Sequence, residues 1–250
     1  MYKIGAIIQA RMGSSRLPGK VMINIKGKSV LAHVIERVQQ CKRLDQIIIA
    51  TTTEPEDDVV VKEAKDCGVS VYRGSSEDVL ARYYEAAKNY DIETIIRITA
   101  DCPLIDPQIV DEMILKYLGH NYEIVTNAGI DLSKRTYPRG LDCSVFSFHA
   151  LREAYYQAQK YREHVTPYIF ETSKSVRVYQ NDVDMSKHRW TLDVPEDLML
   201  IEKIYEYLYH GKHNFYMKDI LALVNTYRLY EINGHIQQKP LKSIEHDPNI

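Results

Sequence analysis

The sequence has few of the residues that mark disulfide scaffolds, zinc sites and membrane spans. Its four cysteines (Cys41, Cys67, Cys102 and Cys143) are scattered over 250 residues without a CxxC pair. This spacing favours reduced thiols and makes a zinc site improbable. The apolar run after the N-terminal Met-Tyr-Lys is too short for a signal peptide, and no later run approaches the length of a membrane span. We therefore expect a cytoplasmic protein without a membrane partner.

Net charge is nearly absent as well. The chain has 32 basic and 34 acidic residues, which gives a formal net charge of −2. No overall positive field invites nucleic acid, so an anionic ligand must be held by local basic clusters. The apolar fraction of 45% and the charged fraction of 26% are ordinary for a soluble globular protein.

The first half alternates short apolar runs with helical patterns. Strands are expected at residues 4–8, 47–49, 69–72 and 94–98, and helices at residues 30–41, 56–67, 78–90 and from Asp106 onward. Asp106 before Pro107 is an N-cap followed by proline, which is a typical helix start. Such alternation is typical of right-handed βαβ units and a parallel sheet.

The second half is less regular. Residues 127–140 are expected to form a loop, residues 141–147, 176–180 and 189–193 strands, and residues 148–159, 163–172 and 195–209 helices. The fold class is therefore α/β, with a Rossmann-like, doubly wound and mostly parallel sheet. We expect one domain over residues 1–230, with a substrate-facing lobe at about 127–190, and a loosely held polar tail at 231–250. Ligands of such sheets bind beyond the carboxyl ends of the strands.

The loop from Gln9 to Lys20 follows the first strand and resembles a phosphate-binding loop in composition. It carries Arg11, Arg16 and Lys20 together with two glycines, which allow backbone N–H groups to approach phosphate oxygens. It is not a Walker A loop, because five residues separate Gly13 from Gly19 and Val21 follows the lysine. A solvated basic turn is the alternative. The position after the first strand favours phosphate binding.

Two aspartates have the position that a magnesium ligand needs. Asp101 and Asp193 each follow an expected strand and precede a proline-containing turn. Mg²⁺ prefers a few carboxylates together with phosphate oxygens and water. The alternative for each is helix capping, which is the better explanation for Asp106, Glu196 and Asp197. Asp182-Val-Asp184 spells the DxD of many glycosyltransferases, but its surroundings indicate a solvated turn.

A second set of cations lies later in the chain, near two aromatic residues. Arg139, Arg162 and Arg189 come from three separate segments, and they suggest an anionic acceptor bound against Tyr137 and Trp190. Alternatively these arginines pair on the surface with Glu153, Glu163 or Glu196. His164 could be a general base or a helix cap. Cys102 has no partner in the sequence and is expected to be a packed thiol.

Taken together, these motifs resemble the sugar-acid cytidylyltransferases, such as the CMP-Kdo and CMP-sialate synthetases. The chain is most similar to the branch typified by the spore coat polysaccharide biosynthesis protein F family. The resemblance is carried over residues 3–210 by Gln9-Ala-Arg-Met-Gly-Ser-Ser-Arg-Leu-Pro-Gly-Lys20, Ala50-Thr-Thr, Arg73-Gly-Ser, Asp78-Val-Leu-Ala-Arg82, Arg97-Ile-Thr-Ala-Asp-Cys-Pro-Leu104, Tyr137-Pro-Arg-Gly-Leu-Asp142, Arg162-Glu-His-Val-Thr166 and Arg189-Trp-Thr-Leu-Asp-Val-Pro-Glu-Asp197.

The resemblance implies a nucleotide-diphospho-sugar transferase fold, CTP as donor, and Mg²⁺ held by Asp101 and Asp193. Arg11, Arg16, Lys20 and Asp101 would be the catalytic set. The expected nucleotide contacts are Ala6, Gln9, Ala10, Arg11, Met12, Gly13, Ser14, Arg16, Lys20, Arg73, Ser75, Thr99 and Ala100. Tyr137, Arg139, Arg162, His164 and Arg189 would face the acceptor. Arg73 and Ser75 could equally belong to a turn.

The expected reaction is an in-line attack by an acceptor oxygen on the α-phosphorus of CTP, with release of pyrophosphate. Positioning and electrostatics would supply the catalysis. The acceptor is expected to be a small acidic sugar or a phosphorylated molecule, in surface polysaccharide synthesis. The alternatives are another nucleotide with a sugar 1-phosphate, a glycosyltransferase, or a binding module. A homodimer closed by the aromatic stretch Tyr155–Phe170 is also expected.

Overall fold

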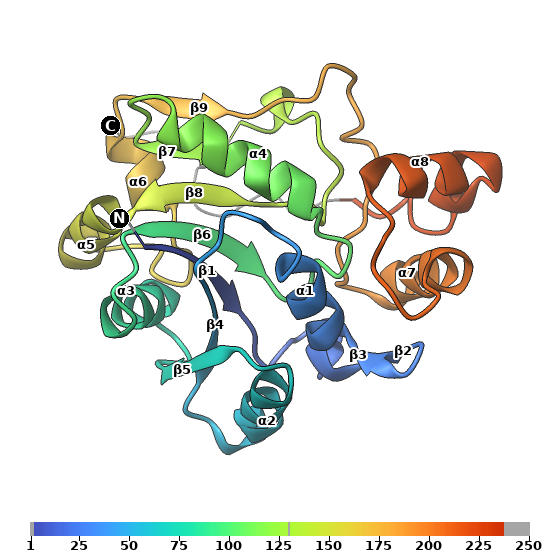
Figure 1. Cartoon of the computed structure of the whole chain (residues 1–250), viewed down its shortest axis with the longest axis horizontal. Coiled ribbons are helices and arrows are strands. Elements are labelled where there is room, and N and C mark those ends of the chain that lie inside the picture. Colours follow the sequence, from blue (N-terminus) through green and yellow to red (C-terminus); the bar gives the residue numbers. More distant parts are fainter. Residues whose placement is uncertain (1–2, 130, 238–250) are drawn as a thin grey trace.

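A twisted seven-stranded sheet forms the centre of the protein. The computed structural model describes residues 3–129 and 131–237, and within them the strand order is β5-β4-β1-β6-β8-β7-β9 (Figure 1). The strands are β1 Ile4–Gln9, β4 Gln46–Thr52, β5 Ser70–Gly74, β6 Thr94–Thr99, β7 Ile124–Thr126, β8 Ser144–Ser147 and β9 Val176–Val178. Only β8 runs against its neighbours in this sheet. The expected α/β class with a mostly parallel sheet is confirmed.

Helices cover both faces of the sheet. They are α1 Val30–Val38, α2 Asp58–Asp66, α3 Val79–Asn89, α4 Pro107–Leu118, α5 Phe148–Gln157, α6 Pro167–Thr172, α7 Pro195–Leu208 and α8 Met217–Thr226. One hydrophobic core joins the sheet to α1, α2, α4, α7 and α8. The other joins it to α3, α5 and α6, which lie together on one side in Figure 1. The doubly wound arrangement follows from these two cores.

Side-chain caps define where several helices begin. Ser29 accepts a hydrogen bond from the Ala32 N–H before α1, and Asp78 accepts one from Ala81 before α3. Asp106 accepts from the Gln108 N–H, with Pro107 as the first residue of α4. A capping side chain satisfies a backbone donor that has no partner within the helix. The predicted start at Asp106-Pro107 is confirmed.

The strand order creates a switch point between β1 and β6. From β1 the chain moves to β4 and β5 on one side, and then returns to β6 on the other. Gln9 at the end of β1 is paired in register with Thr99 at the end of β6. The loops that follow these two residues diverge from one point, which is where open α/β sheets bind ligands.

Some expected elements differ in the structure. Residues 189–193 form no strand: Arg189 makes a single bridge to Arg139, and the chain then turns so that the Leu192 N–H bonds to the Asp101 carbonyl. The helix expected at 163–172 begins at Pro167, after a turn in which Tyr161 has a φ of 60°.

Three short elements carried too little periodicity to be predicted. They are β7, α8 and the hairpin of β2 Asn24–Ile25 with β3 Lys28–Ser29. Single 3-10 turns lie at Lys20–Met22, Pro55–Asp57, Leu132–Lys134 and Leu229–Glu231. The expected lobe at 127–190 contributes β8, β9, α5 and α6 to the common sheet and its helical layer.

The beginning of the expected polar tail is held in place. Asn233 is buried, and its amide donates to the Arg189 carbonyl at 2.8 Å and to Asp197 Oδ1 at 2.9 Å. Residues 238–250 of that tail lie outside the described residues. Among the described residues, no helix combines the length and the apolar character that a membrane crossing requires.

Candidate functional site

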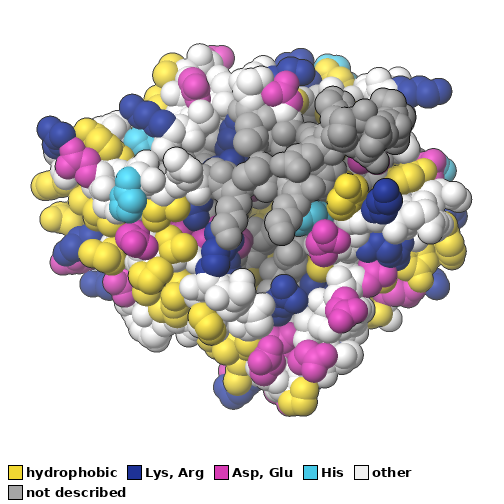
Figure 2. All heavy atoms as spheres, turned by 180° about the vertical axis from the view of Figure 1, so that it is seen from behind, with side chains coloured by type: hydrophobic (Ala, Val, Ile, Leu, Met, Phe, Trp, Pro, Cys, Tyr) yellow, Lys and Arg dark blue, Asp and Glu magenta, His cyan; other side chains and the backbone are white. Residues whose placement is uncertain are grey.

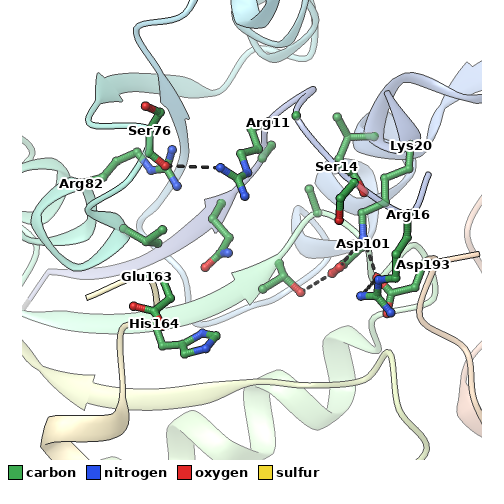
Figure 3. Close-up of a pocket in the computed structure, with 18 of the residues that line it drawn as sticks. Arg11, Ser14, Arg16, Lys20, Ser76, Arg82, Asp101, Glu163, His164 and Asp193 are labelled. Carbon is green, nitrogen blue, oxygen red and sulfur yellow. Dashed lines mark hydrogen bonds and ion pairs between the residues drawn. The ribbon is translucent and has the colours of Figure 1, made fainter. Parts of the chain in front are cut away.

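A cleft of about 620 Å³ opens at the carboxyl ends of β1 and β6. It is lined by Gln9, Ala10, Arg11, Gly13, Ser14, Ser15, Arg16, Lys20, Val21, Ser76, Glu77, Val79, Arg82, Thr99, Ala100, Asp101, Glu163, His164 and Asp193. Figure 3 shows three groups around it: Arg11 with Arg82, Lys20 with Asp101 and Asp193, and His164 with Glu163. The described surface outside the cleft mixes charges of both signs, as Figure 2 shows for one face.

The loop after β1 is held open by a buried carboxylate. Asp57 accepts the Met12 N–H at 2.7 Å and also binds the hydroxyl of Thr52 at the end of β4. Within the described residues, the backbone N–H groups of Gly13 and Ser15 make no hydrogen bond and lie beside the cleft. Such backbone donors next to cations suit an anion. The expectation of a phosphate-binding loop therefore has matching geometry.

Lys20 lies between the two aspartates that were expected to hold metal. Its Nζ is 2.8 Å from Asp101 Oδ2 and 2.8 Å from Asp193 Oδ1. Gly19, with a φ of 69°, adopts the left-handed conformation that directs the chain into this position. Burial disfavours the ammonium charge, but the two carboxylates outweigh burial and raise the pKa of Lys20.

The Asp101 carboxylate is kept ionised in this arrangement. Burial would raise the pKa of Asp101, but the Lys20 charge, the Lys20 hydrogen bond and the Thr99 hydroxyl lower it below its ordinary value. Asp101 and Asp193 already bind one cation together, the Lys20 ammonium. Their carboxylate oxygens are also the ligands that a divalent cation such as Mg²⁺ prefers. No group of three or more His, Cys, Asp or Glu side chains positioned to hold a metal occurs in the described ranges. Phosphate oxygens or water would have to complete the coordination of Mg²⁺.

Arg189 supports Asp193 rather than facing the cleft. Its Nη2 is 3.1 Å from Asp193 Oδ2, and its Nε is 2.8 Å from Asp197 Oδ1. Asp197 is fully buried and also accepts the N–H groups of Asp193 and Val194. Arg189 does not line the cleft and its Nε and Nη2 are bound to carboxylates, which corrects the expectation that it contacts the acceptor.

Arg82 at one end of the cleft is a residue that the sequence analysis did not select. It is 2% exposed, and its Nε and Nη1 are buried without a hydrogen-bond partner. Arg11 lies opposite and donates to the Ser76 carbonyl at 3.3 Å (Figure 3). Burial lowers the pKa of Arg82, and the nearby Arg11 charge lowers it further. Two guanidinium groups at one end of a cleft call for an electron-rich ligand.

Arg97 on the central strand β6 is a second arginine that was not selected from the sequence and that has a buried donor without a partner. Its Nε is buried without a partner, and its Nη2 reaches Gln9 Oε1 at 3.5 Å. Because side chains alternate along a strand, Arg97 shares a face with Thr99, which lines the cleft. His164 is close enough that, after burial, the Arg97 charge helps to lower its pKa, while Glu163 opposes this shift. His164 is therefore held neutral beside the cleft and does not begin a helix.

The expected acceptor residues are only partly brought together. Arg162 binds Asp78 at 2.8 Å and the carbonyls of Tyr155 and Ala158, so it joins α3 to the end of α5. Tyr137 and Trp190 are buried, which contradicts an acceptor stacked against them.

Arg139 is half-buried next to Arg189, and its backbone bonds to His188 and Trp190, whereas its guanidinium has no hydrogen-bond partner within residues 3–129 and 131–237. Burial lowers its pKa to about 10, with a further contribution from Arg135. Gly140 must be glycine, since its φ is 95° and an added Cβ would lie 2.4 Å from the Trp190 carbonyl carbon. The Pro-Arg-Gly motif therefore fixes backbone geometry beside Arg139.

Other predicted residues lie outside the cleft. Ala6 is core, Met12 anchors the loop through its backbone, and Ser75 accepts the N–H groups of Glu77 and Asp78 in a turn. Arg73 is bound to the carbonyls of Thr52 and Glu54 and to Asp58, which corrects its assignment as a nucleotide contact.

The structure also locates the DxD sequence and Cys102, for which the sequence left other roles open. Asp182 and Asp184 lie in an exposed turn, where Asp184 accepts the Ser186 N–H. Cys102 is buried, and burial raises the pKa of its thiol well above the ordinary value, as expected for a packed side chain.

Comparisons with known proteins agree with this geometry. A family model described as cytidylyltransferase matches residues 5–223. The spore coat polysaccharide biosynthesis protein SpsF of Bacillus subtilis is 32% identical over 216 residues, which is 82% of this chain and 88% of that protein. A cytidylyltransferase structure from Leptospira borgpetersenii has a TM-score of 0.86 at 34% identity and covers 96% of this chain and 100% of the other.

A more distant structure shares the fold. It is that of a CMP:2-keto-3-deoxy-manno-octonic acid synthetase complexed with CTP, with a TM-score of 0.65 at 19% identity, and the match covers 82% of this chain and 98% of the other. The resemblance stated from the sequence motifs is thereby confirmed.

Proposed function

This chain belongs to the cytidylyltransferase family and is a nucleotidyltransferase, and from that premise we propose that it transfers CMP from CTP to a small acidic acceptor and releases pyrophosphate. The acceptor would be a sugar acid or a phosphorylated small molecule that enters surface polysaccharide synthesis. The observation that carries the proposal is the cleft at the β1–β6 switch point. There a basic loop with uncommitted N–H groups faces two carboxylates that share one cation.

The side chains of the cleft would have different roles, according to their chemistry, toward the triphosphate and the nucleoside. Arg11, Arg16 and Lys20, together with the N–H groups of Gly13 and Ser15, would hold the triphosphate and take up the charge that develops on pyrophosphate. Arg82 would offer its buried, unpartnered donors to the carbonyl oxygen or the ring nitrogen of the cytosine base or to the ribose. An unpaired buried cation is costly, so a ligand that satisfies it gains affinity.

The remaining residues would serve the acceptor and the metal. Arg97 shares a sheet face with Thr99 and His164 lines the cleft, so both would serve the acceptor, as would Arg139 beside the Arg189–Asp193 pair. Asp101 and Asp193 would hold Mg²⁺, which when bound neutralises phosphate charge and orients the α-phosphate. The acceptor oxygen attacks the α-phosphorus in line, and the bond from that phosphorus to the α,β-bridging oxygen breaks, so that this oxygen leaves with the β- and γ-phosphates as pyrophosphate. A neutral His164 could accept the proton of the attacking hydroxyl.

We also infer a homodimer from the aromatic surface of α3 and α5. Tyr84 and Tyr155 stack with ring centroids 4.1 Å apart, and Tyr156 beside them is 63% exposed. Exposed aromatic clusters of this kind are enriched at interfaces. Light scattering at micromolar concentration tests this inference, and a monomeric mass would contradict it.

The experiment that tests the proposed function is a pyrophosphate-release screen. Each of the four nucleoside triphosphates is paired with a panel of acidic sugars and phosphorylated small molecules, in the presence of Mg²⁺. We expect release with CTP and at least one acidic acceptor. Release with another nucleotide and a sugar 1-phosphate would replace the proposal with that alternative.

A further inference from the structure

The carboxylates proposed to hold metal are already engaged by the protein's own side chains, most of them cations. Asp193 Oδ1 lies 2.8 Å from both Lys20 Nζ and Arg16 Nη2, and its Oδ2 lies 3.1 Å from Arg189. Asp101 Oδ2 is bound by Lys20, and its Oδ1 accepts the Thr99 hydroxyl at 2.6 Å. The site is therefore charge-compensated before any ligand arrives.

Lys20 occupies the position between the carboxylates. It is the side chain in the described cleft that contacts both Asp101 and Asp193, and it is 12% exposed, whereas Arg16 contacts Asp193 alone and is 44% exposed. A Mg²⁺ ion binds carboxylate oxygens at about 2.0–2.1 Å. The Lys20 ammonium and a divalent metal ion would have to bind the same two carboxylate oxygens. Their positive charges would then be in contact, so binding of one excludes the other.

We infer that Lys20 is a displaceable cation that closes the metal position until a triphosphate offers it another anion, so that metal binding and nucleotide binding are coupled. This inference rests on the proposed function, because it takes the loop's anion to be a triphosphate. A triphosphate held by the loop would bring anionic oxygens close to the ammonium, because Lys20 belongs to the same loop as Arg11, Gly13 and Ser15, which line the cleft beside it. By linkage, each ligand then favours the other by the same factor.

The test separates metal from nucleotide, so that neither measurement needs an acceptor or turnover. In the first arm, Mn²⁺, which shares the oxygen preference of Mg²⁺, is titrated into the nucleotide-free full-length protein and followed by its electron paramagnetic resonance signal. We expect Lys20→Met to bind Mn²⁺ at least about tenfold more tightly than wild type. Arg16→Met is the matched control, since it also removes a cation from Asp193. The inference is overturned if Lys20→Met does not bind Mn²⁺ more tightly than wild type, or if Arg16→Met gains as much Mn²⁺ affinity as Lys20→Met does.

In the second arm, CTP is titrated calorimetrically in EDTA. Asp101→Asn leaves Lys20 in place but loosens its hold on the carboxylates, so we expect it to bind metal-free CTP more tightly than wild type. Glu163→Gln, which removes a carboxylate from the cleft without touching Lys20, is the charge control. Unchanged or weaker CTP binding by Asp101→Asn, or an equal gain in Glu163→Gln, contradicts the inference. If CTP does not bind wild type even when Mg²⁺ replaces the EDTA, the proposed function fails while the first arm still decides the role of Lys20.

Discussion

The guanidinium of Arg189 holds the carboxylate of Asp193 in place, with its Nη2 3.1 Å from Asp193 Oδ2. It also contacts Asp197, at 2.8 Å to each carboxylate oxygen. Asp197 in turn accepts the Asp193 N–H and the Asn233 amide. The side chain that points into the cleft is therefore supported by a buried network from the start of α7 and from residue 233. A site residue oriented in this way depends on groups that never touch the ligand.

The Arg189–Asp197 pair should contribute strongly to stability. Arg189→Met leaves the fully buried Asp197 carboxylate without its cation, and we expect a loss of about 3–5 kcal/mol in the free energy of unfolding. Urea unfolding measures this loss. Lys203→Met, which breaks the exposed ion pair with Glu206, is the matched control and should leave stability unchanged. Equal effects in the two variants would refute the network.

Metal dependence should reside in the cleft and not in the exposed DxD sequence. Asp101→Asn and Asp193→Asn should each remove most Mg²⁺-dependent pyrophosphate release, because each loses a charged oxygen ligand. Asp182→Asn and Asp184→Asn alter an exposed turn and should be near neutral. A Mg²⁺ titration of pyrophosphate release compares the four variants. The reverse pattern would move the protein toward a glycosyltransferase.

Arg97 and Arg139 should separate acceptor binding from nucleotide binding. Each lacks a carboxylate partner in the described residues, and a charge-assisted hydrogen bond is worth on the order of 1.5–3 kcal/mol, or about 10- to 150-fold in affinity. Arg97→Gln and Arg139→Gln should raise the acceptor KM within this range and change the CTP KM less than about twofold. Arg82→Gln should instead raise the CTP KM within this range and change the acceptor KM less than about twofold. Equal effects on both substrates would show that the cleft is not divided in this way.

Stability should fall on mild acidification because of a buried histidine pair. His33 Nε2 donates to the Ile25 carbonyl at 2.8 Å, so its Nδ1 must accept from His213 Nε2, also at 2.8 Å. Burial lowers the pKa of both rings, and the Glu36 charge, whose Oε2 lies 3.3 Å from His213 Nδ1, partly opposes the shift of His33. Unfolded histidine takes up its proton near pH 6.5, so below that pH the unfolded chain binds more protons and the free energy of unfolding decreases.

Urea unfolding between pH 7.5 and 5.5 checks this sign. His213→Gln should flatten the decline by up to about 1.4 kcal/mol per pH unit well below pH 6.5. The exposed His149→Gln is the matched control. An unchanged slope in His213→Gln would contradict neutral burial of the pair.

The sequence predicted the parts of the site that follow strands. Lys20, Asp101 and the basic loop were identifiable because the carboxyl ends of β1 and β6 meet at one edge. Asp193 was selected for a strand that does not exist, yet its proline-containing turn brings it to the same place. Arg82 and Arg97 could not be identified, because their importance lies in buried donors without partners, and pairing is a property of the folded chain. For the same reason Arg162 and Arg189 were assigned to the acceptor when both are paired with aspartates.

The fate of the phosphorus atoms of CTP tests the central claim most directly. CTP labelled with ³²P at the α or the γ position is incubated with the enzyme, Mg²⁺ and the acidic panel, and the products are separated by ion-exchange chromatography. Nucleotidyl transfer predicts the α label in a new CMP–acceptor conjugate and the γ label in pyrophosphate. The γ label in the acceptor or in orthophosphate, with the α label remaining in CDP, would contradict the account.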